Sequence, residues 1–99
     1  MNLFLLSNKA KNDLGNIALF SYHRWGKEQR NIYIRQFDEA FGLLAKNPSI
    51  GIPCNNIQKD FYKFPQGSHL IFYKLIDKNS IHIIRILHKS VDVSAIIED

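Results

Sequence analysis

Three basic side chains lie close together at the end of an apolar segment, in Arg85-Ile86-Leu87-His88-Lys89. Cleavage of RNA through its own 2′-hydroxyl needs a base for that hydroxyl, an acid for the leaving oxygen and cations for the developing phosphate charge. A guanidinium, an imidazole and an ammonium group could supply these functions, and Lys63 and Lys74 could add positive charge. Arg85, His88 and Lys89 are therefore candidate catalytic residues of a ribonuclease.

The alternation of side chains along a strand argues against this grouping. A regular strand would put Arg85 and His88 on opposite faces, and only a bulge would bring them together. One face would carry Ile81, Ile83, Arg85 and Leu87, and the other His82, Ile84, Ile86 and His88. This favours a second hypothesis, in which Ile84 and Ile86 pack on helices while Ile83, Arg85 and Leu87 present a surface to a protein partner.

A partner surface is also indicated by the preceding strand, because it is apolar on both faces. An exposed apolar patch beyond a few hundred Å² is unusual on a soluble monomer, so either the C-terminal tail with Ile96 and Ile97 or another molecule should cover the second face. The candidate partner-binding residues are Lys63, Tyr73, Lys74, Ile83, Arg85, Leu87, His88 and Lys89. Since an unpaired buried Arg85 would be costly, we expect its side chain to face solvent, a carboxylate or a phosphate. We expect the solvent-facing case, in which Arg85→Ala costs little stability.

Two helices that could cover the sheet are indicated by apolar residues at helical spacing. Ser7 is a good N-cap for a helix that begins at Asn8, and Gly26 is a typical helix end. A second helix from Lys27 should end at Asn47-Pro48. The two apolar stripes consist of Ala10, Leu14, Ile17, Ala18, Ser21 and Trp25, and of Tyr33, Phe37, Ala40, Phe41 and Leu44. Because little more than Gly26 separates the helices, we expect an antiparallel helical hairpin.

The rest of the chain has the pattern of strands and turns. Residues 2–6 form a short apolar run, and 60–65, 69–76 and 81–88 are rich in β-branched and aromatic residues. The segment 47–56 is typical of a loop. The predicted order is β-α-α-β-β-β with a short C-terminal tail, an α+β fold whose helical hairpin packs on one face of an antiparallel sheet. The first strand must pair with an edge of that sheet or insert into it.

Length and composition limit the remaining possibilities. The 99 residues predict one domain, and the net charge of +4 favours an acidic partner. The lone Cys54 excludes an intramolecular disulfide, and no His, Cys or carboxylate pair has metal-ligand spacing. Neither a Gly-rich phosphate loop nor a nucleic-acid recognition motif is present. We expect a cytoplasmic protein without cofactor, metal, membrane segment or direct sequence-specific contact with nucleic acid.

Several segments, taken in order, resemble the ParE branch of the RelE/ParE superfamily of bacterial toxin–antitoxin modules. The likeness extends from residues 7–14 through Trp25-Gly26 and residues 44–51 to Asp92. Its most characteristic parts are His69-Leu70-Ile71-Phe72-Tyr73-Lys74 and Arg85-Ile86-Leu87-His88-Lys89-Ser90-Val91-Asp92. The chain differs from many such proteins at Ser68, where an Arg commonly follows the turn glycine.

This resemblance implies a single toxin domain over residues 1–99, neutralised by an antitoxin that is encoded beside it. It also implies growth inhibition through DNA gyrase, in which cleaved DNA is trapped, and places the chain among proteins linked to plasmid stabilisation. The sister RelE branch consists of ribosome-dependent mRNA endoribonucleases, which is the alternative function. Because the alternation separates Arg85 from His88, we expect no catalytic activity of the chain's own.

Overall fold

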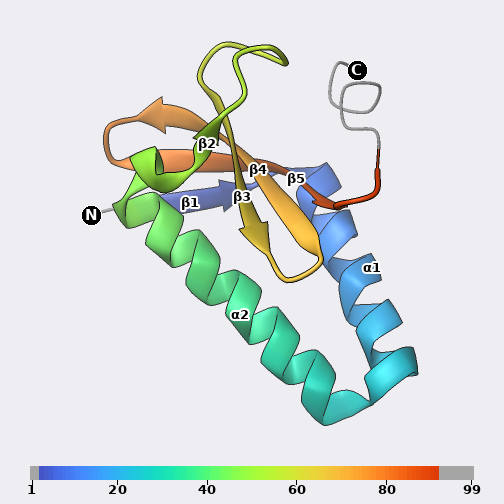
Figure 1. Ribbon diagram of the computed structural model, residues 1–99. Helices are drawn as coiled ribbons and strands as arrows, with labels where there is room; N and C mark the ends of the chain where they lie inside the picture. Colours follow the sequence, from blue (N-terminus) through green and yellow to red (C-terminus); the bar gives the residue numbers. More distant parts are fainter. Residues whose placement is uncertain (1–2, 92–99) are drawn as a thin grey trace.

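The computed structural model of the chain describes residues 3–91 as two helices packed on a five-stranded sheet (Figure 1). The elements are β1 (Leu3–Leu6), α1 (Asn8–Trp25), α2 (Lys27–Lys46), a 3-10 turn (Pro48–Ile50), β2 (Ile52–Pro53), β3 (Phe61–Gln66), β4 (His69–Asp77) and β5 (Ser80–His88). This confirms the predicted α+β fold and order. It adds the short strand β2, which lies within the segment that we predicted as a loop.

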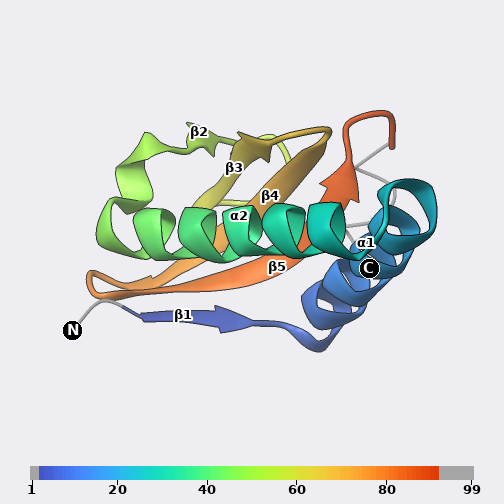
Figure 2. The same ribbon diagram turned by 90° about the horizontal axis from the view of Figure 1, so that it is seen from below.

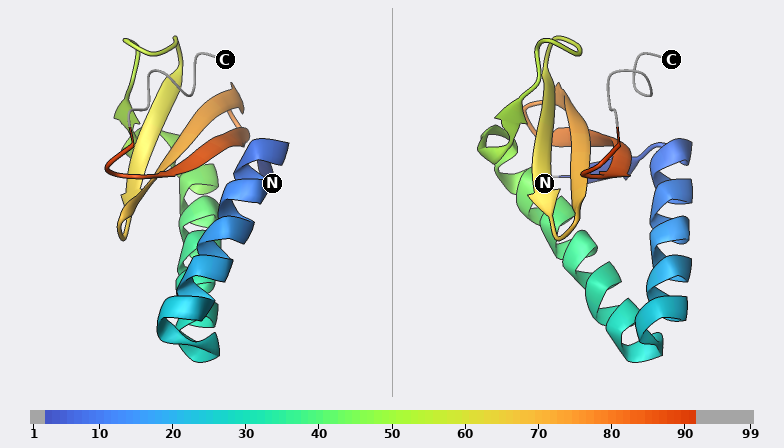
Figure 3. Two further views of the ribbon diagram at one scale, coloured as in Figure 1. Left: turned by 90° about the vertical axis from the view of Figure 1, so that its right-hand side faces the viewer. Right: turned by 45° about the vertical axis from the view of Figure 1, so that its right-hand side comes forward.

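The ends of the helices follow the predicted signals. Ser7 caps α1, since its Oγ accepts a hydrogen bond from the backbone N–H of Ala10 at 2.9 Å. Gly26 ends α1 and precedes α2 with a φ of 93°, a conformation that favours glycine. The two helices diverge from this turn toward the sheet, so that they form a V whose tip projects beyond it (Figures 1 and 3).

The sheet has the strand order β1-β5-β4-β3-β2. Strands β2 to β5 pair in antiparallel fashion, whereas β1 pairs parallel to β5 and forms one edge, alongside β5 in Figure 2. The edge position of β1 is one of the two possibilities that the sequence left open. The edge stops at Leu6, and beyond it the first turns of α1 take its place beside β5: the Ser7 hydroxyl donates to the Ile84 carbonyl at 2.7 Å.

Both faces of the sheet carry a buried cluster. On the helix face, Phe37, Phe41, Leu44, Ile71 and Ile81 belong to the main core. On the opposite face Phe61, Phe72 and Leu87 pack with Cys54, and Ile57 and Val91 pack against them. The segment between β2 and β3 thus helps to cover the face for which we expected the tail or another molecule. Ile96 and Ile97 lie outside the described residues.

A bulge in β5 changes the predicted alternation. Phe72 of β4 pairs with Arg85 and the next residue, Tyr73, pairs with Ile83, so Ile84 has no partner of its own. As a result Ile83 belongs to the main core with Ile86, and Ile84 packs against the cluster on the opposite face. The prediction that Ile86 contacts the helix side is confirmed, but the predicted faces of Ile83 and Ile84 were wrong. Within residues 3–91, no helix has the length and apolar character needed to cross a membrane.

Candidate functional site

The predicted partner-binding residues do not form one surface. Lys63 pairs with Phe72 and Lys74 with Phe61, so both lysines are on the face opposite the helices. Tyr73 and Ile83 are on the helix face and are both 0% exposed. The Tyr73 hydroxyl donates to the Pro48 carbonyl at 2.6 Å, and burial raises the pKa of Tyr73 to about 12. These two side chains are therefore core residues, and Leu87 is buried in the second cluster.

Arg85 forms an ion pair that the sequence did not specify. Its Nε and Nη2 donate to the two carboxylate oxygens of Asp13 on α1, at 2.8 and 3.0 Å. The backbone N–H of Ile86 donates to the same carboxylate at 3.0 Å. Bonding to Asp13 raises the pKa of Arg85, and its side chain is 17% exposed. Arg85 thus faces a carboxylate, one of the three expected environments, and the expectation that it faces solvent was wrong.

His88 and Lys89 lie at the exposed end of β5. His88 is on the helix face opposite His69, and their rings are 5.4 Å apart, whereas Arg85 pairs with Phe72 on the other side of the sheet. The bulge therefore leaves Arg85 and His88 on different faces. His88 Nδ1 is 2.8 Å from the Ser90 hydroxyl, and the Lys89 backbone N–H donates to the Ser68 carbonyl at 3.0 Å. The candidate ribonuclease residues are not gathered around a common point.

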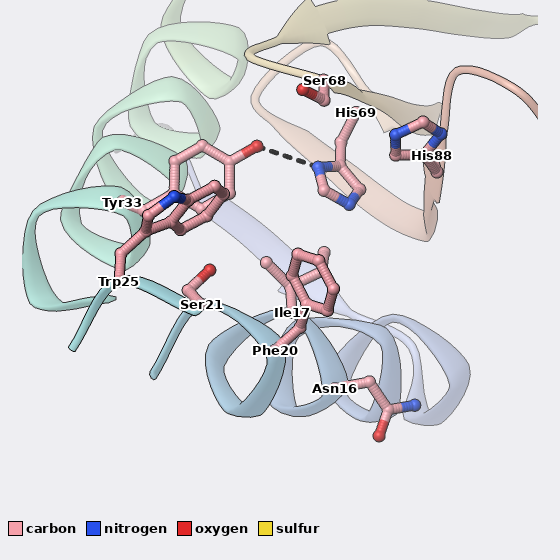
Figure 4. A pocket seen from close by; sticks show the side chains of 9 residues that line it. All are labelled: Asn16, Ile17, Phe20, Ser21, Trp25, Tyr33, Ser68, His69 and His88. Atoms are coloured by element: carbon pink, nitrogen blue, oxygen red, sulfur yellow. Dashed lines mark hydrogen bonds between the residues drawn. The ribbon is translucent and has the colours of Figure 1, made fainter. Parts of the chain in front are cut away.

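A pocket of about 300 Å³ lies where the two helices diverge from each other (Figure 4). Its walls come from one side of α1, from Trp25 and Tyr33 near the tip of the V, and from Ser68, His69 and His88 at the end of the sheet. A neighbouring pocket of about 400 Å³ shares Trp25, Tyr33 and Ser68 with it. Sequence reasoning did not predict this site, because it assigned Ile17, Ser21, Trp25 and Tyr33 to apolar helix stripes that fill a core.

A Tyr–His pair forms the polar wall of the pocket. Tyr33 Oη is 2.8 Å from His69 Nδ1, and the two rings lie beside each other (Figure 4). Burial lowers the pKa of His69, nearby His88 lowers it further, and Asp13 opposes both. Burial also raises the pKa of Tyr33. We therefore expect a neutral imidazole and a protonated phenol at pH 7, joined by one hydrogen bond between Tyr33 Oη and His69 Nδ1.

The turn between β3 and β4 allows Tyr33 to approach this closely. Gly67 has a φ of 59°, and a Cβ atom there would lie 2.7 Å from Tyr33 Oη. A side chain at this position would be strained and would push the phenol away from His69. Gly67 was predicted only as a turn residue, whereas the structure shows that it also makes room for the Tyr–His pair.

The mouth of the pocket is aromatic and open to solvent. Phe20 is 60% exposed and Trp25 is 54% exposed, with ring centroids 6.0 Å apart in an edge-to-face arrangement. Deeper in, Ser21 is 1% exposed and its Oγ has no hydrogen-bond partner in the described part of the chain. The polar Ser21 within an otherwise apolar stripe was the sequence signal that could have revealed the site. Among residues 3–91, no group of three His, Cys, Asp or Glu side chains could hold a metal ion.

Comparison with known proteins assigns the chain to a family. Residues 4–93 match the model of the family described as ParE toxin of type II toxin–antitoxin system, parDE. The chain is 37% identical over 90 residues to Toxin ParE1 of Mycobacterium tuberculosis, covering 91% of this chain and 92% of that protein. It is 35% identical over 95 residues to Toxin ParE1 of Caulobacter vibrioides, covering 96% and 97% of the two chains.

Solved structures show the same fold at lower sequence identity. A chain of the chromosomal ParDE toxin–antitoxin system from P. aeruginosa superposes with a TM-score of 0.73 at 18% identity, covering 89% of this chain and 95% of that one. A chain of the toxin–antitoxin complex RelBE2 from Mycobacterium tuberculosis gives a TM-score of 0.58 at 18% identity, with 89% and 98% covered. These two structures show the fold, whereas the family match over nearly the whole chain and the two ParE1 relatives show that the chain belongs to the ParE toxin family of type II toxin–antitoxin systems.

Proposed function

We propose that this ParE toxin inhibits growth by acting on DNA gyrase and is neutralised by a cognate antitoxin protein. The family match over residues 4–93 is the observation that carries the proposal. The M. tuberculosis structure with this fold comes from a toxin–antitoxin complex and the P. aeruginosa structure from a ParDE toxin–antitoxin system, which supports an antitoxin partner for this chain as well.

The surface that we propose for the antitoxin is the sheet face opposite the helices. Lys63 and Lys74 lie there in a half-buried position, and Lys89 is exposed beyond the end of β5. Ile52, which pairs with Lys63, is 51% exposed, so an apolar side chain stands next to the positive charge. An acidic segment with apolar residues would complement this face in charge and in apolar area.

The other candidate contacts fit this proposal unequally. The Arg85 side chain is bonded to Asp13 and is 17% exposed, so only this exposed part could touch a partner. His88 borders the pocket on the helix side. Tyr73 and Ile83 would support the surface from within the core, without touching a partner.

The double variant Lys63→Glu and Lys74→Glu is expected to weaken antitoxin binding. The matched control is Lys27→Glu with Lys46→Glu, at exposed positions of α2, and it should bind the antitoxin as the wild type does.

Induction of the chain in cells tests the toxin function and its mode of action. We expect growth to stop and the DNA-damage (SOS) response to rise, because a trapped gyrase complex leaves broken DNA. Co-expression of the cognate antitoxin should restore growth. Unaffected growth, or arrest that proceeds through mRNA cleavage on ribosomes, would overturn the proposal.

A further inference from the structure

The buried hydroxyl of Ser21 is an unsatisfied polar group at the floor of the pocket. A hydroxyl that is removed from water without a hydrogen-bond partner is destabilising, so buried polar groups in native proteins almost always have one. Ser21 is 1% exposed and has no partner in the described chain. Figure 4 shows its oxygen pointing into the space between Tyr33, Phe20 and His69. A bound water or another molecule in the pocket could supply the missing partner.

His69 offers a second donor to the same space. In the tautomer in which Nδ1 accepts from Tyr33, the proton of the neutral imidazole lies on Nε2. That N–H is not used by any hydrogen bond among residues 3–91. Within the same part of the chain, the residues that line the pocket include two imidazoles, an Asn and two Ser, and none of them carries a carboxylate. The polar part of the pocket consequently offers donors to a hydrogen-bond acceptor.

The rest of the pocket favours an apolar body of limited size. Ile17, Phe20 and Trp25 provide aliphatic and aromatic walls, and the volume of about 300 Å³ is at the lower end of the range for small-molecule sites. An apolar side chain inserted by a protein partner would fill these walls but would leave Ser21 and His69 unpaired. A molecule with an apolar body and an acceptor at one end satisfies both parts of the pocket.

We propose that this pocket binds a small amphipathic carboxylate. Its body, about the size of one aromatic ring with a short chain, lies against Phe20 and Trp25, and its carboxylate accepts hydrogen bonds from Ser21 and His69. This binding site is on the helix side, separate from the sheet face proposed for the antitoxin. It does not depend on the action of the chain on gyrase.

Phenylbutyrate is a suitable probe, because it joins one aromatic ring to a carboxylate through a short chain. Trp25 is the single tryptophan of the chain and lies at the pocket, so its emission reports occupancy directly. We expect a saturable change in Trp25 emission when phenylbutyrate is titrated into the purified protein. Phenylbutanol, which keeps the body and lacks the carboxylate, should bind at least about fivefold more weakly, since charged hydrogen bonds are stronger than neutral ones.

Variants separate this site from general apolar adsorption. Ser21→Ala removes one donor without adding volume, and should weaken phenylbutyrate about tenfold. Leu19→Ala is the matched control on α1, because Leu19 is exposed and does not line the pocket; it should bind like the wild type. The proposal is overturned if phenylbutyrate produces no saturable change, if phenylbutanol binds equally well, or if Ser21→Ala and Leu19→Ala bind it alike.

Discussion

The Arg85–Asp13 pair and the pocket around Ser21 both lie between α1 and the end of the sheet, but their polar groups are satisfied differently. At the ion pair, the Asp13 carboxylate accepts three hydrogen bonds, from Arg85 Nε, Arg85 Nη2 and the backbone N–H of Ile86. In the pocket, the Ser21 hydroxyl has no partner among residues 3–91. The first site binds the helix to the sheet, whereas the second is arranged for a molecule that is not part of the chain.

The difference comes from how far α1 lies from the sheet at each point. Its first turns replace β1 beside β5, and there backbone and side chains bond directly across the gap. Its last turns follow the V away from the sheet (Figure 3). The pocket lies there, lined by α1, by Tyr33 of α2 and by the end of the sheet. Because the helices diverge, the first turns of α1 make the stabilising contact with β5, whereas its last turns line the proposed binding pocket.

Removal of a core side chain beside the pocket should have the largest effect. Phe37 is completely buried and its ring contacts those of Tyr33 and His69, with centroids 5.1 and 5.9 Å away. Phe37→Ala should lower the free energy of unfolding by about 3–5 kcal/mol, because it leaves a cavity in the core. Denaturant unfolding measures this loss. A near-neutral effect would show that Phe37 is not part of the core.

Loss of the ion-pair carboxylate should have the next largest effect. Asp13→Ala leaves Arg85 and the N–H of Ile86 without their acceptor, at a partly exposed site, and should cost about 1–3 kcal/mol of unfolding free energy. Asp38→Ala, at an exposed position of α2, is the control and should stay within about 0.5 kcal/mol of the wild type. Equal stability of the two variants would contradict a stabilising role for the Arg85–Asp13 pair.

Two serines of α1 allow the comparison to be made with the same substitution. Ser7 both caps the helix and donates to Ile84, so Ser7→Ala should cost about 0.5–2 kcal/mol. Ser21→Ala removes an unpaired buried hydroxyl, and should leave the free energy of unfolding unchanged or slightly higher. Thermal and denaturant unfolding of the two variants measure the contrast. A loss at Ser21 as large as that at Ser7 would mean that its hydroxyl has a partner in the apo protein.

The smallest expected effect is the dependence of stability on pH through His69. Because the folded protein lowers the pKa of His69, the unfolded chain binds a proton more readily as the pH falls below about 6.5. The contribution of His69 to stability should therefore be constant above that pH and decline below it. The unfolding free energy of the wild type should therefore decrease relative to that of His69→Gln as the pH is lowered from neutral to acidic values. A difference that rises as the pH falls would contradict the buried neutral imidazole.

Local signals in the sequence predicted most of the fold. Ser7 and Gly26 marked the ends of α1, and the period of the apolar residues distinguished the helices from the strands. The bulge at Ile84 was not predictable, since it depends on pairing with β4 and on contacts that the start of α1 makes with β5. The Asp13 partner of Arg85 is 72 residues away in sequence, so no local pattern could indicate it.

The candidate site was less predictable than the fold. Lys63 and Lys74 are half-buried and Lys89 is exposed, and their binding of a partner stays a prediction. The faces of Ile83 and Ile84 were exchanged by the bulge. An amphipathic stripe predicts which residues point inward, without showing whether the space they face is filled. The pocket at Ser21 and His69 depends on the angle between two helices, which is a property of the whole fold.

Inhibition of purified gyrase by the purified chain tests the proposed function most directly. We expect the chain to suppress the supercoiling of relaxed plasmid DNA by gyrase and to increase the amount of cleaved DNA. The cognate antitoxin, added in equal amount, should restore supercoiling. Unchanged supercoiling at a large excess of folded chain would contradict gyrase as the target.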